Sequence, residues 1–185
     1  MHVVCVCCYR NEADIIEPFV RQTAAYCEEL ILLDHGSTDE SAEIVRALKQ
    51  EGLRLHLLTD RTLGNIEADQ TNRLLLLAAH ECAADWIVPI DADEFIIGAT
   101  DKSFLPAALP GTTTCLKLRS SSYYTHANDR EDLLNPVERI THRLMEEAAD
   151  MKVTVPGWLV RGRRAHRAGQ AGTPNCVRNS QATSA

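Results

Sequence analysis

Short apolar runs alternate with amphipathic segments along the N-terminal half of the chain. Apolar runs of strand length are typical of buried strands, and apolar residues three or four positions apart are typical of helices. Consecutive parallel strands need a crossover connection, so a repeated strand–helix–strand order predicts an α/β fold with a mainly parallel sheet and helices on both faces. The predicted strands cover residues 3–8, 29–33, 53–58 and 86–90.

Helix signals separate these strands. A helix is expected to begin near Glu17, because Pro18 is comfortable only in a first turn. Ser37 and Glu40 have the spacing of a capping box and Gly52 has the position of a helix C-cap, so a second helix is expected between them. A third helix and two further strands are expected over residues 71–84, around Leu116 and Leu118, and over residues 151–155.

Composition and charge divide the chain into two parts. Its 185 residues, 45% hydrophobic and 24% charged, suit one folded domain. All 26 acidic residues lie within residues 1–160, whereas residues 161–185 hold five arginines and no periodic apolar pattern. We therefore expect a domain over residues 1–160 and a flexible tail rich in Arg, Gly and Ala over residues 161–185. Because so acidic a body repels phosphates, no nucleic-acid partner is expected.

The seven cysteines are odd in number and irregularly spaced, which indicates free thiols. Cys5, Cys7 and Cys8 lie in a predicted strand and are interpreted as small buried residues. A metal site built on them is the less favoured alternative, because no second Cys/His pair has zinc-ligand spacing. No stretch reaches the roughly 20 apolar residues that a bilayer requires, and no signal-peptide pattern follows Met1. These features predict a cytoplasmic protein without a transmembrane segment.

Polar side chains, most of them carboxylates, follow three of the predicted strands. In open parallel sheets, ligands bind outside the carboxyl ends of the strands, so side chains at these ends are expected to lie along one edge. They are Arg10, Asn11 and Glu12 after the first strand, Asp34 after the second, and Asp91 and Asp93 after the fourth.

Asp91 and Asp93 form an Asp-x-Asp pair between two apolar segments. Crowded carboxylates are unfavourable unless a cation or a proton relieves them, and Mg²⁺ or Mn²⁺ usually takes one or two protein carboxylates and completes its shell with water and phosphates. The pair therefore predicts a metal–diphosphate site in which the cation stabilises a departing diphosphate. The alternative is that the two acids only solvate a turn. Asp34 has a similar alternative, in which its side chain caps its own turn.

Missing motifs argue against three other classes of site. No GxGxxG follows the first strand and no GxxxxGK[ST] is present, which excludes a Rossmann dinucleotide site and a P-loop. No GxSxG elbow is present, which argues against a serine hydrolase.

Three segments, in this order and spacing, resemble the family 2 glycosyltransferases of GT-A fold. They are Arg10-Asn11-Glu12-Ala13-Asp14, Leu33-Asp34-His35-Gly36-Ser37-Thr38-Asp39 and Asp91-Ala92-Asp93-Glu94-Phe95. The resemblance covers about residues 1–160. It implies a GT-A-like domain that binds a nucleotide-diphosphate sugar and transfers the sugar to an acceptor, which could be a glycan, a lipid or a protein.

The resemblance also implies roles for single residues. Asn11 and Glu12 match residues that lie against the base and ribose, with Arg10 where many members have an aromatic residue. Asp34 matches an acid that contacts the nucleoside. Asp91 and Asp93 match the pair that holds ribose and a Mn²⁺ or Mg²⁺ ion on the diphosphate.

Inverting members of the family place a general base well after the Asp-x-Asp pair, and no residue here matches its motif. The candidates are Glu138, Glu146, Glu147 and Asp150, so the catalytic residue is unassigned. The family's acceptor-site segment also has no counterpart after residue 160. One hypothesis is that residues 161–185 are a truncated or altered end.

Three functions stay open. A metal-dependent glycosyltransferase is the leading hypothesis. The second is a degenerate module that binds nucleotide and metal without turnover. The third is another metal-dependent phosphate enzyme, a nucleotidyltransferase or an aspartate-nucleophile phosphatase. The phosphatase is weakened because its Asp-x-Asp should follow the first strand, and here the pair follows the fourth.

Overall fold

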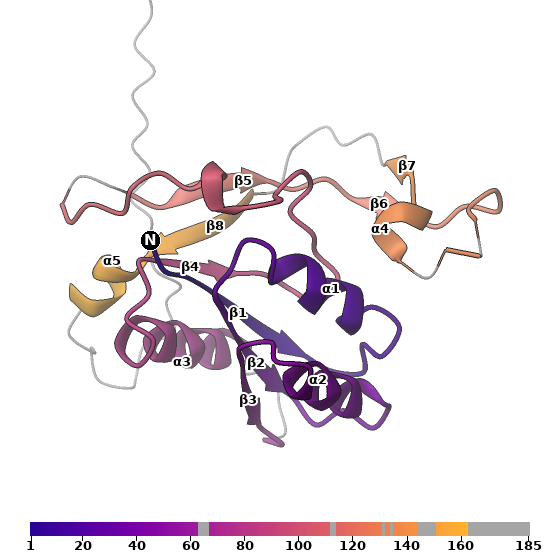
Figure 1. The fold of residues 1–185 in the computed structure, drawn as a ribbon, viewed down its shortest axis with the longest axis horizontal. Helices are drawn as coiled ribbons and strands as arrows, with labels where there is room; N and C mark the ends of the chain where they lie inside the picture. Colours follow the sequence, from indigo (N-terminus) through magenta and orange to yellow (C-terminus); the bar gives the residue numbers. More distant parts are fainter. Residues whose placement is uncertain (63–66, 112–113, 131, 134, 144–150, 163–185) are drawn as a thin grey trace, which may run out of the picture.

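The computed structural model describes residues 1–62, 67–111, 114–130, 132–133, 135–143 and 151–162. Its centre is a six-stranded sheet in the order β3-β2-β1-β4-β8-β5 (Figure 1). Four neighbouring strands are parallel, namely β3 (Leu55–Thr59), β2 (Glu29–Asp34), β1 (Val3–Tyr9) and β4 (Trp86–Pro89). The last two, β8 (Met151–Pro156) and β5 (Leu116–Arg119), continue the sheet by antiparallel pairing. The predicted mainly parallel sheet is confirmed.

Helices cover both faces of the parallel strands. On one face lie α1 (Ile16–Thr23) and α2 (Ser41–Gln50), and on the other lies α3 (Glu67–His80) (Figure 1). In β1, Val3, Cys5 and Cys7 belong to the core under α1 and α2, whereas Val4 and Val6 pack with α3. Successive side chains of a strand point to opposite faces, so a strand buried on both sides needs an unbroken apolar run. Cys5 and Cys7 are small buried residues, as predicted, whereas Cys8 is only half-buried.

The start of α2 differs from the prediction. A capping box between Ser37 and Glu40 is wrong, because α2 begins at Ser41 and Glu40 makes no capping hydrogen bond. Instead, the Asp39 carboxylate accepts hydrogen bonds from the Ser41 backbone N–H at 3.1 Å and from its hydroxyl at 2.5 Å. The end of α2 is as predicted, since Gly52 follows it with a φ of 104°.

The end of α3 is earlier than predicted. The helix ends at His80 rather than near residue 84, because the chain turns at Ala83, whose φ of 51° is left-handed. Two backbone N–H groups beyond the helix, those of Glu81 and Cys82, donate to the Leu77 carbonyl and close the last turn.

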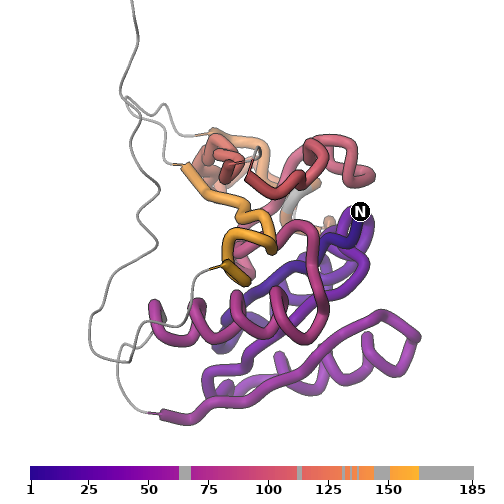
Figure 2. Tube along the Cα trace, turned by 90° about the vertical axis from the view of Figure 1, so that its left-hand side faces the viewer, coloured from indigo at the N-terminus to yellow at the C-terminus, as the bar shows by residue number. Residues whose placement is uncertain are grey.

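The last described element, α5 (Gly157–Gly162), lies beside α3 in both views (Figure 1, Figure 2). The Arg161 guanidinium donates to the carbonyl oxygens of Ala79 at 3.0 Å and Ala84 at 2.9 Å. The first two residues of the predicted tail therefore belong to α5. The rest of that tail, residues 163–185, lies outside the described residues.

Small elements lie outside the main sheet. A two-stranded ribbon of β6 and β7 projects from it together with α4 (Figure 1). Their bounds, with that of one 3₁₀ turn, are β6 (Tyr123–Tyr124), α4 (Pro136–Arg139), β7 (His142–Arg143) and η1 (Lys102–Phe104). Within the part of the chain that the structure describes, no helix combines the length and the apolarity needed to cross a bilayer.

The junction of β8 and α5 gives a stability prediction. A Cβ atom at Gly157 would lie 1.9 Å from the Ala84 carbonyl oxygen, a backbone atom that cannot rotate away. Gly157→Ala should therefore lower the free energy of unfolding by about 2 kcal/mol, the usual cost of overpacking. Gly162→Ala, at the end of the same helix and with nothing within 4 Å of its Cβ, is the matched control. Urea unfolding measures both, and equal midpoints for the two variants would contradict the close contact.

Candidate functional site

A cleft of about 1180 Å³ opens at the carboxyl ends of the parallel strands. Its walls come from the turns after β1, β2 and β4 and from the beginning of β8. Of the residues that the sequence singled out, Arg10, Glu12, Asp91 and Asp93 line it. Asn11 and Asp34 lie in the same turns but are not lining residues. The structure thus brings the predicted residues to one edge of the sheet, four of them into the cleft itself.

Asn11 joins the first two turns. It has a φ of 56°, and its side-chain oxygen accepts hydrogen bonds from the Thr38 backbone N–H at 2.8 Å and the Thr38 hydroxyl at 3.3 Å. In the opposite direction, its own backbone N–H donates to Ser37 Oγ at 3.0 Å. Asp34 Oδ1 accepts a hydrogen bond from the Ser37 N–H at 2.8 Å, so it caps its own turn. Asn11 and Asp34, both predicted to bind the nucleotide, therefore contribute to the shape of the cleft by holding the backbone of the turn after β2.

Asp39 and Ser41 also connect the same two turns by hydrogen bonds. Besides capping α2, the Asp39 carboxylate accepts a hydrogen bond from the Ala13 N–H at 3.1 Å. Ser41 Oγ in turn accepts one from the Glu12 N–H at 2.8 Å. The hydrogen bonds from Ser41, together with that from the Ala13 N–H, lower the pKa of Asp39 below its usual range. The sequence pointed to Ser37 for this role because serine and aspartate are both good N-caps.

Three carboxylates, those of Glu12, Asp91 and Asp93, line the cleft. Partial burial raises the pKa of Glu12, and the charges of Asp93, Asp14 and Asp39 raise it further. The repulsion favours a proton or a cation at this place. Asp91 and Asp93 follow β4 in a tight turn, in which the Glu94 N–H donates to the Asp91 carbonyl at 3.0 Å. Both carboxylates of the Asp-x-Asp pair are exposed at the end of β4.

Lys152 supplies a cation directly at the Asp-x-Asp turn. Its ammonium lies 2.6 Å from Asp91 Oδ2 and 3.0 Å from Glu94 Oε2. Partial burial works against the charge of Lys152, but the hydrogen bonds to the two carboxylates outweigh it and raise the pKa of the ammonium. Because β8 is antiparallel to β4, its first residues lie where β4 ends. The ammonium thus occupies one of the two oxygens that Asp91 could offer to a metal ion.

Two arginines and a polar pair complete the walls. Arg10 and Arg61 line the cleft and are exposed, so both can meet an anionic ligand. Gln70 of α3 lies 2.8 Å from His35 Nδ1, and both residues also line the cleft. Sequence reasoning missed Arg61 and Lys152. Lys152 lies within a segment already noted as a strand, and only the direction of that strand reveals its contact with Asp91.

Of the four candidates for a general base, only Glu138 is among the described residues, and it does not line the cleft. Glu138 is exposed on α4, accepts a hydrogen bond from Asn135 Nδ2 at 3.3 Å, and is not a lining residue. The other candidates, Glu146, Glu147 and Asp150, lie outside the described residues. Among the residues that are described, Asp91 and Asp93 do not form a preassembled cluster with a third metal-ligating side chain. Mg²⁺ and Mn²⁺ do not need one where a diphosphate supplies further oxygens.

The sequence model of Glycosyl transferase family 2 matches residues 3–151. This chain belongs to glycosyltransferase family 2. The match covers all four parallel strands and the Asp-x-Asp turn, and the GT-A-like architecture expected from the sequence is confirmed. No curated protein matches this family member significantly.

Solved glycosyltransferase structures resemble part of this family 2 chain. TarS from S. aureus (residues 1–349) has 20% identity and a TM-score of 0.45 over 56% of this chain and 30% of its own. The mannosyltransferase PcManGT from Pyrobaculum calidifontis, in complex with GDP-Man and Mn²⁺, has 22% identity and a TM-score of 0.40 over 50% and 27%. Glucosyl-3-phosphoglycerate synthase from Mycobacterium tuberculosis has 23% identity and a TM-score of 0.34 over 50% and 33%. The chain therefore spans about a third or less of each.

The tie between the two turns predicts a pH-dependent stability. The pKa of Asp39 is lower in the folded chain than in the unfolded one, so its stabilising effect is present above the unfolded pKa and is lost as the pH falls through the folded pKa. Asp39→Ala should therefore lower the thermal midpoint at neutral pH, and the gap from wild type should close in acid. Asp14→Ala, an exposed carboxylate of the same turn, is the control and should show no such gap. A constant gap for Asp39→Ala across this pH range would contradict the assignment.

Proposed function

We propose that this chain carries the donor site of a metal-dependent glycosyltransferase, which moves a sugar from a nucleotide diphosphate to an acceptor. The observation that carries the proposal is the position of Asp91 and Asp93. In a member of family 2, they lie at the carboxyl edge of the sheet, in a cleft that also holds Glu12, Arg10 and Arg61. Ligands of open α/β sheets bind at this edge.

The charges of the cleft suit a metal–diphosphate complex. Asp91 and Asp93 would hold Mn²⁺ or Mg²⁺, which supplies charge stabilisation to the departing diphosphate. Arg10 and Arg61, both cationic and exposed in the cleft, would bind the phosphates or the nucleoside. The carboxylate of Glu12 is available to ribose hydroxyls, whereas Asn11 and Asp34 would act by fixing the turns that present the backbone.

A nucleotide- and metal-binding module without turnover is the second candidate. One observation favours it: Glu138, the described candidate for a general base, is not a lining residue of the cleft. Both candidates share the donor site and differ in whether the donor sugar is transferred or hydrolysed. The acceptor, whether glycan, lipid or protein, and the cytoplasmic location stay predictions from the sequence.

Nucleotide and metal should stabilise the folded chain together. We expect one of UDP, GDP, CDP or dTDP to raise the thermal midpoint in the presence of Mn²⁺ and to have little effect without it. A ligand at 100 times its Kd adds about 2.7 kcal/mol to the free energy of unfolding, which a melting curve resolves readily. The double variant Asp91→Asn/Asp93→Asn should lose the effect.

Asp132→Asn is the matched control for this experiment. Asp132 is exposed and paired with Arg130, outside the cleft, so its variant should respond to nucleotide as wild type does. A folded wild-type protein that responds to none of the four nucleotides would sink the donor-site assignment. Where binding is found, an assay of donor hydrolysis and transfer separates the enzyme from the binding module.

Lys152 should oppose metal binding in the free protein. Since its ammonium occupies the contact with Asp91 and Glu94, Lys152→Met should bind Mn²⁺ alone several times more tightly than wild type. Lys117→Met, an exposed lysine on the adjacent β5, should leave the affinity unchanged. Electron paramagnetic resonance of free Mn²⁺ measures both. An affinity that is equal or weaker in Lys152→Met would show that the lysine does not compete with the metal.

A further inference from the structure

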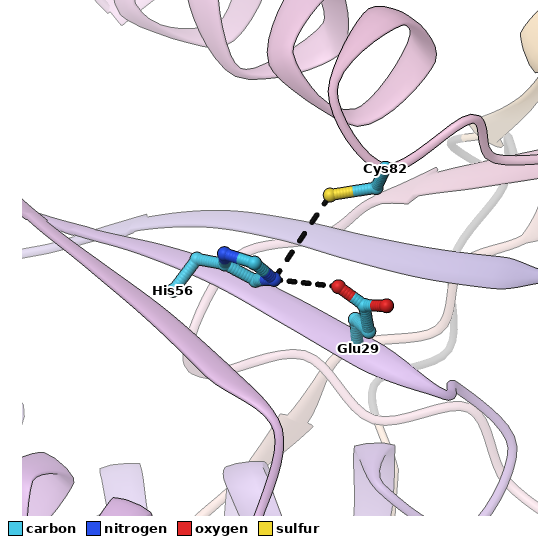
Figure 3. Close-up of side chains that lie close together, drawn as sticks. All are labelled: Glu29, His56 and Cys82. Atoms are coloured by element: carbon cyan, nitrogen blue, oxygen red, sulfur yellow. Dashed lines mark hydrogen bonds and ion pairs between the residues drawn. The ribbon is translucent and has the colours of Figure 1, made fainter.

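A group of side chains that could bind a metal ion lies toward the amino-terminal ends of the parallel strands, away from the cleft. Glu29 begins β2, His56 is in β3, and Cys82 follows α3 (Figure 3). One ligand atom from each lies within 4.8 Å of the others, and in the described residues this is the one group of three or more His, Cys, Asp or Glu side chains that converges so closely. The length of β2, about 16 Å at the usual rise, separates Glu29 from the cleft edge.

Both contacts of His56 use the same ring nitrogen. Nε2 lies 2.5 Å from Glu29 Oε2 and 4.0 Å from Cys82 Sγ (Figure 3). In a nucleophilic relay, the acid and the thiol would use opposite nitrogens of the imidazole. Here an oxygen, a nitrogen and a sulfur converge, as the ligands of a metal ion do. The arrangement therefore argues against a cysteine nucleophile and for a shared cation.

Neighbouring side chains orient the Glu29 carboxylate. Its side chain is only 7% exposed, and its other oxygen, Oε1, contacts the Arg54 guanidinium and lies 3.2 Å from His2 Nε2. Burial alone would raise the pKa of Glu29, but the hydrogen bond from His56 and the charges of Arg54 and His2 lower it. Glu29 is thus a buried anion with Oε2 turned toward His56 and Cys82.

A cation that binds sulfur would change the protonation of the Cys82 thiol. Burial, with the nearby Glu29 carboxylate, raises the pKa of Cys82 to about 11, so the thiol stays protonated at neutral pH. A divalent ion reverses this preference, because it binds the thiolate and the thiol proton passes to solvent. One thiolate, one imidazole and one carboxylate form a ligand set that Zn²⁺ accepts and that Mg²⁺ or Ca²⁺ does not.

We propose that Glu29 Oε2, His56 Nε2 and Cys82 Sγ bind a Zn²⁺ ion, with water in the fourth position. The ion would link the edge strand β3 to the turn after α3. It would be separate from the cation expected at Asp91 and Asp93, and the proposal does not depend on glycosyl transfer.

Untagged, metal-free protein titrated with Co²⁺ tests the site. Co²⁺ in place of Zn²⁺ gives a thiolate charge-transfer band in the near ultraviolet, which ligation by carboxylates at Asp91 and Asp93 cannot produce. We expect one equivalent of Co²⁺ to develop this band and Zn²⁺ to remove it. Affinity should rise with pH, because protons on the thiol and imidazole compete with the ion. A folded protein that develops no band would overturn the proposal.

Single variants locate the ligands. Cys82→Ser should abolish the band, and His56→Gln should weaken Co²⁺ binding at least tenfold. Cys115→Ser and His80→Gln, in the same chain but outside the cluster, should bind as wild type does. A band that persists in Cys82→Ser would place the thiolate elsewhere and refute the site.

Alkylation of the wild-type protein gives a test that needs no variant. Zn²⁺ should protect Cys82 from iodoacetamide, as read by mass spectrometry of its peptide. Equal labelling of Cys82 with and without Zn²⁺ would also refute the site.

Discussion

The parallel pairing of β1 with β2 and β4 is the constraint on which the cleft depends. Parallel strands end at the same edge, so the turns after Tyr9, Asp34 and Pro89 are brought together although they are far apart in sequence. The pairing is secured by burial on both faces, under α1 and α2 on one side and α3 on the other. Hydrogen bonds of Asn11 and Asp39 then lock two of the turns to each other.

Charge balance is the second constraint on this edge. Glu12, Asp91 and Asp93 line one cleft in a chain with a formal net charge of −7. Lys152 neutralises part of this charge at Asp91, and Arg10 and Arg61 add positive charge at the walls. A diphosphate that binds together with a divalent cation could place its negative charges near the arginines and the cation near the carboxylates. Such complementarity lets an acidic chain bind an anionic ligand.

The sequence predicted the parallel strands and the edge that holds the acids, because burial on two faces leaves an unbroken apolar run and the topology places the strand ends together. It did not predict the direction of β8, since antiparallel and parallel strands have the same local pattern when buried. Lys152 was therefore missed.

The cluster of Glu29, His56 and Cys82 was hidden for a different reason. Its members are separated by 27 and 26 positions and lie in β2, in β3 and in the turn after α3, so no short motif marks them. The sequence indicated Ser37 as the cap of α2, whereas Asp39 makes the capping hydrogen bond, because spacing alone does not decide hydrogen-bond geometry.

The close contact of Gly157 with Ala84, directly after β8, has a consequence at the beginning of that strand. Side chains alternate between the faces of a strand, so slipping β8 by one residue along β4 would turn Lys152 to the opposite face and bring an apolar neighbour, Met151 or Val153, beside Asp91. The absence of a side chain at Gly157 allows the observed alignment, in which its N–H donates to the Asp85 carbonyl at 2.8 Å. A residue with no side chain, just beyond the end of β8, thereby helps to keep the Lys152 ammonium beside the Asp-x-Asp turn.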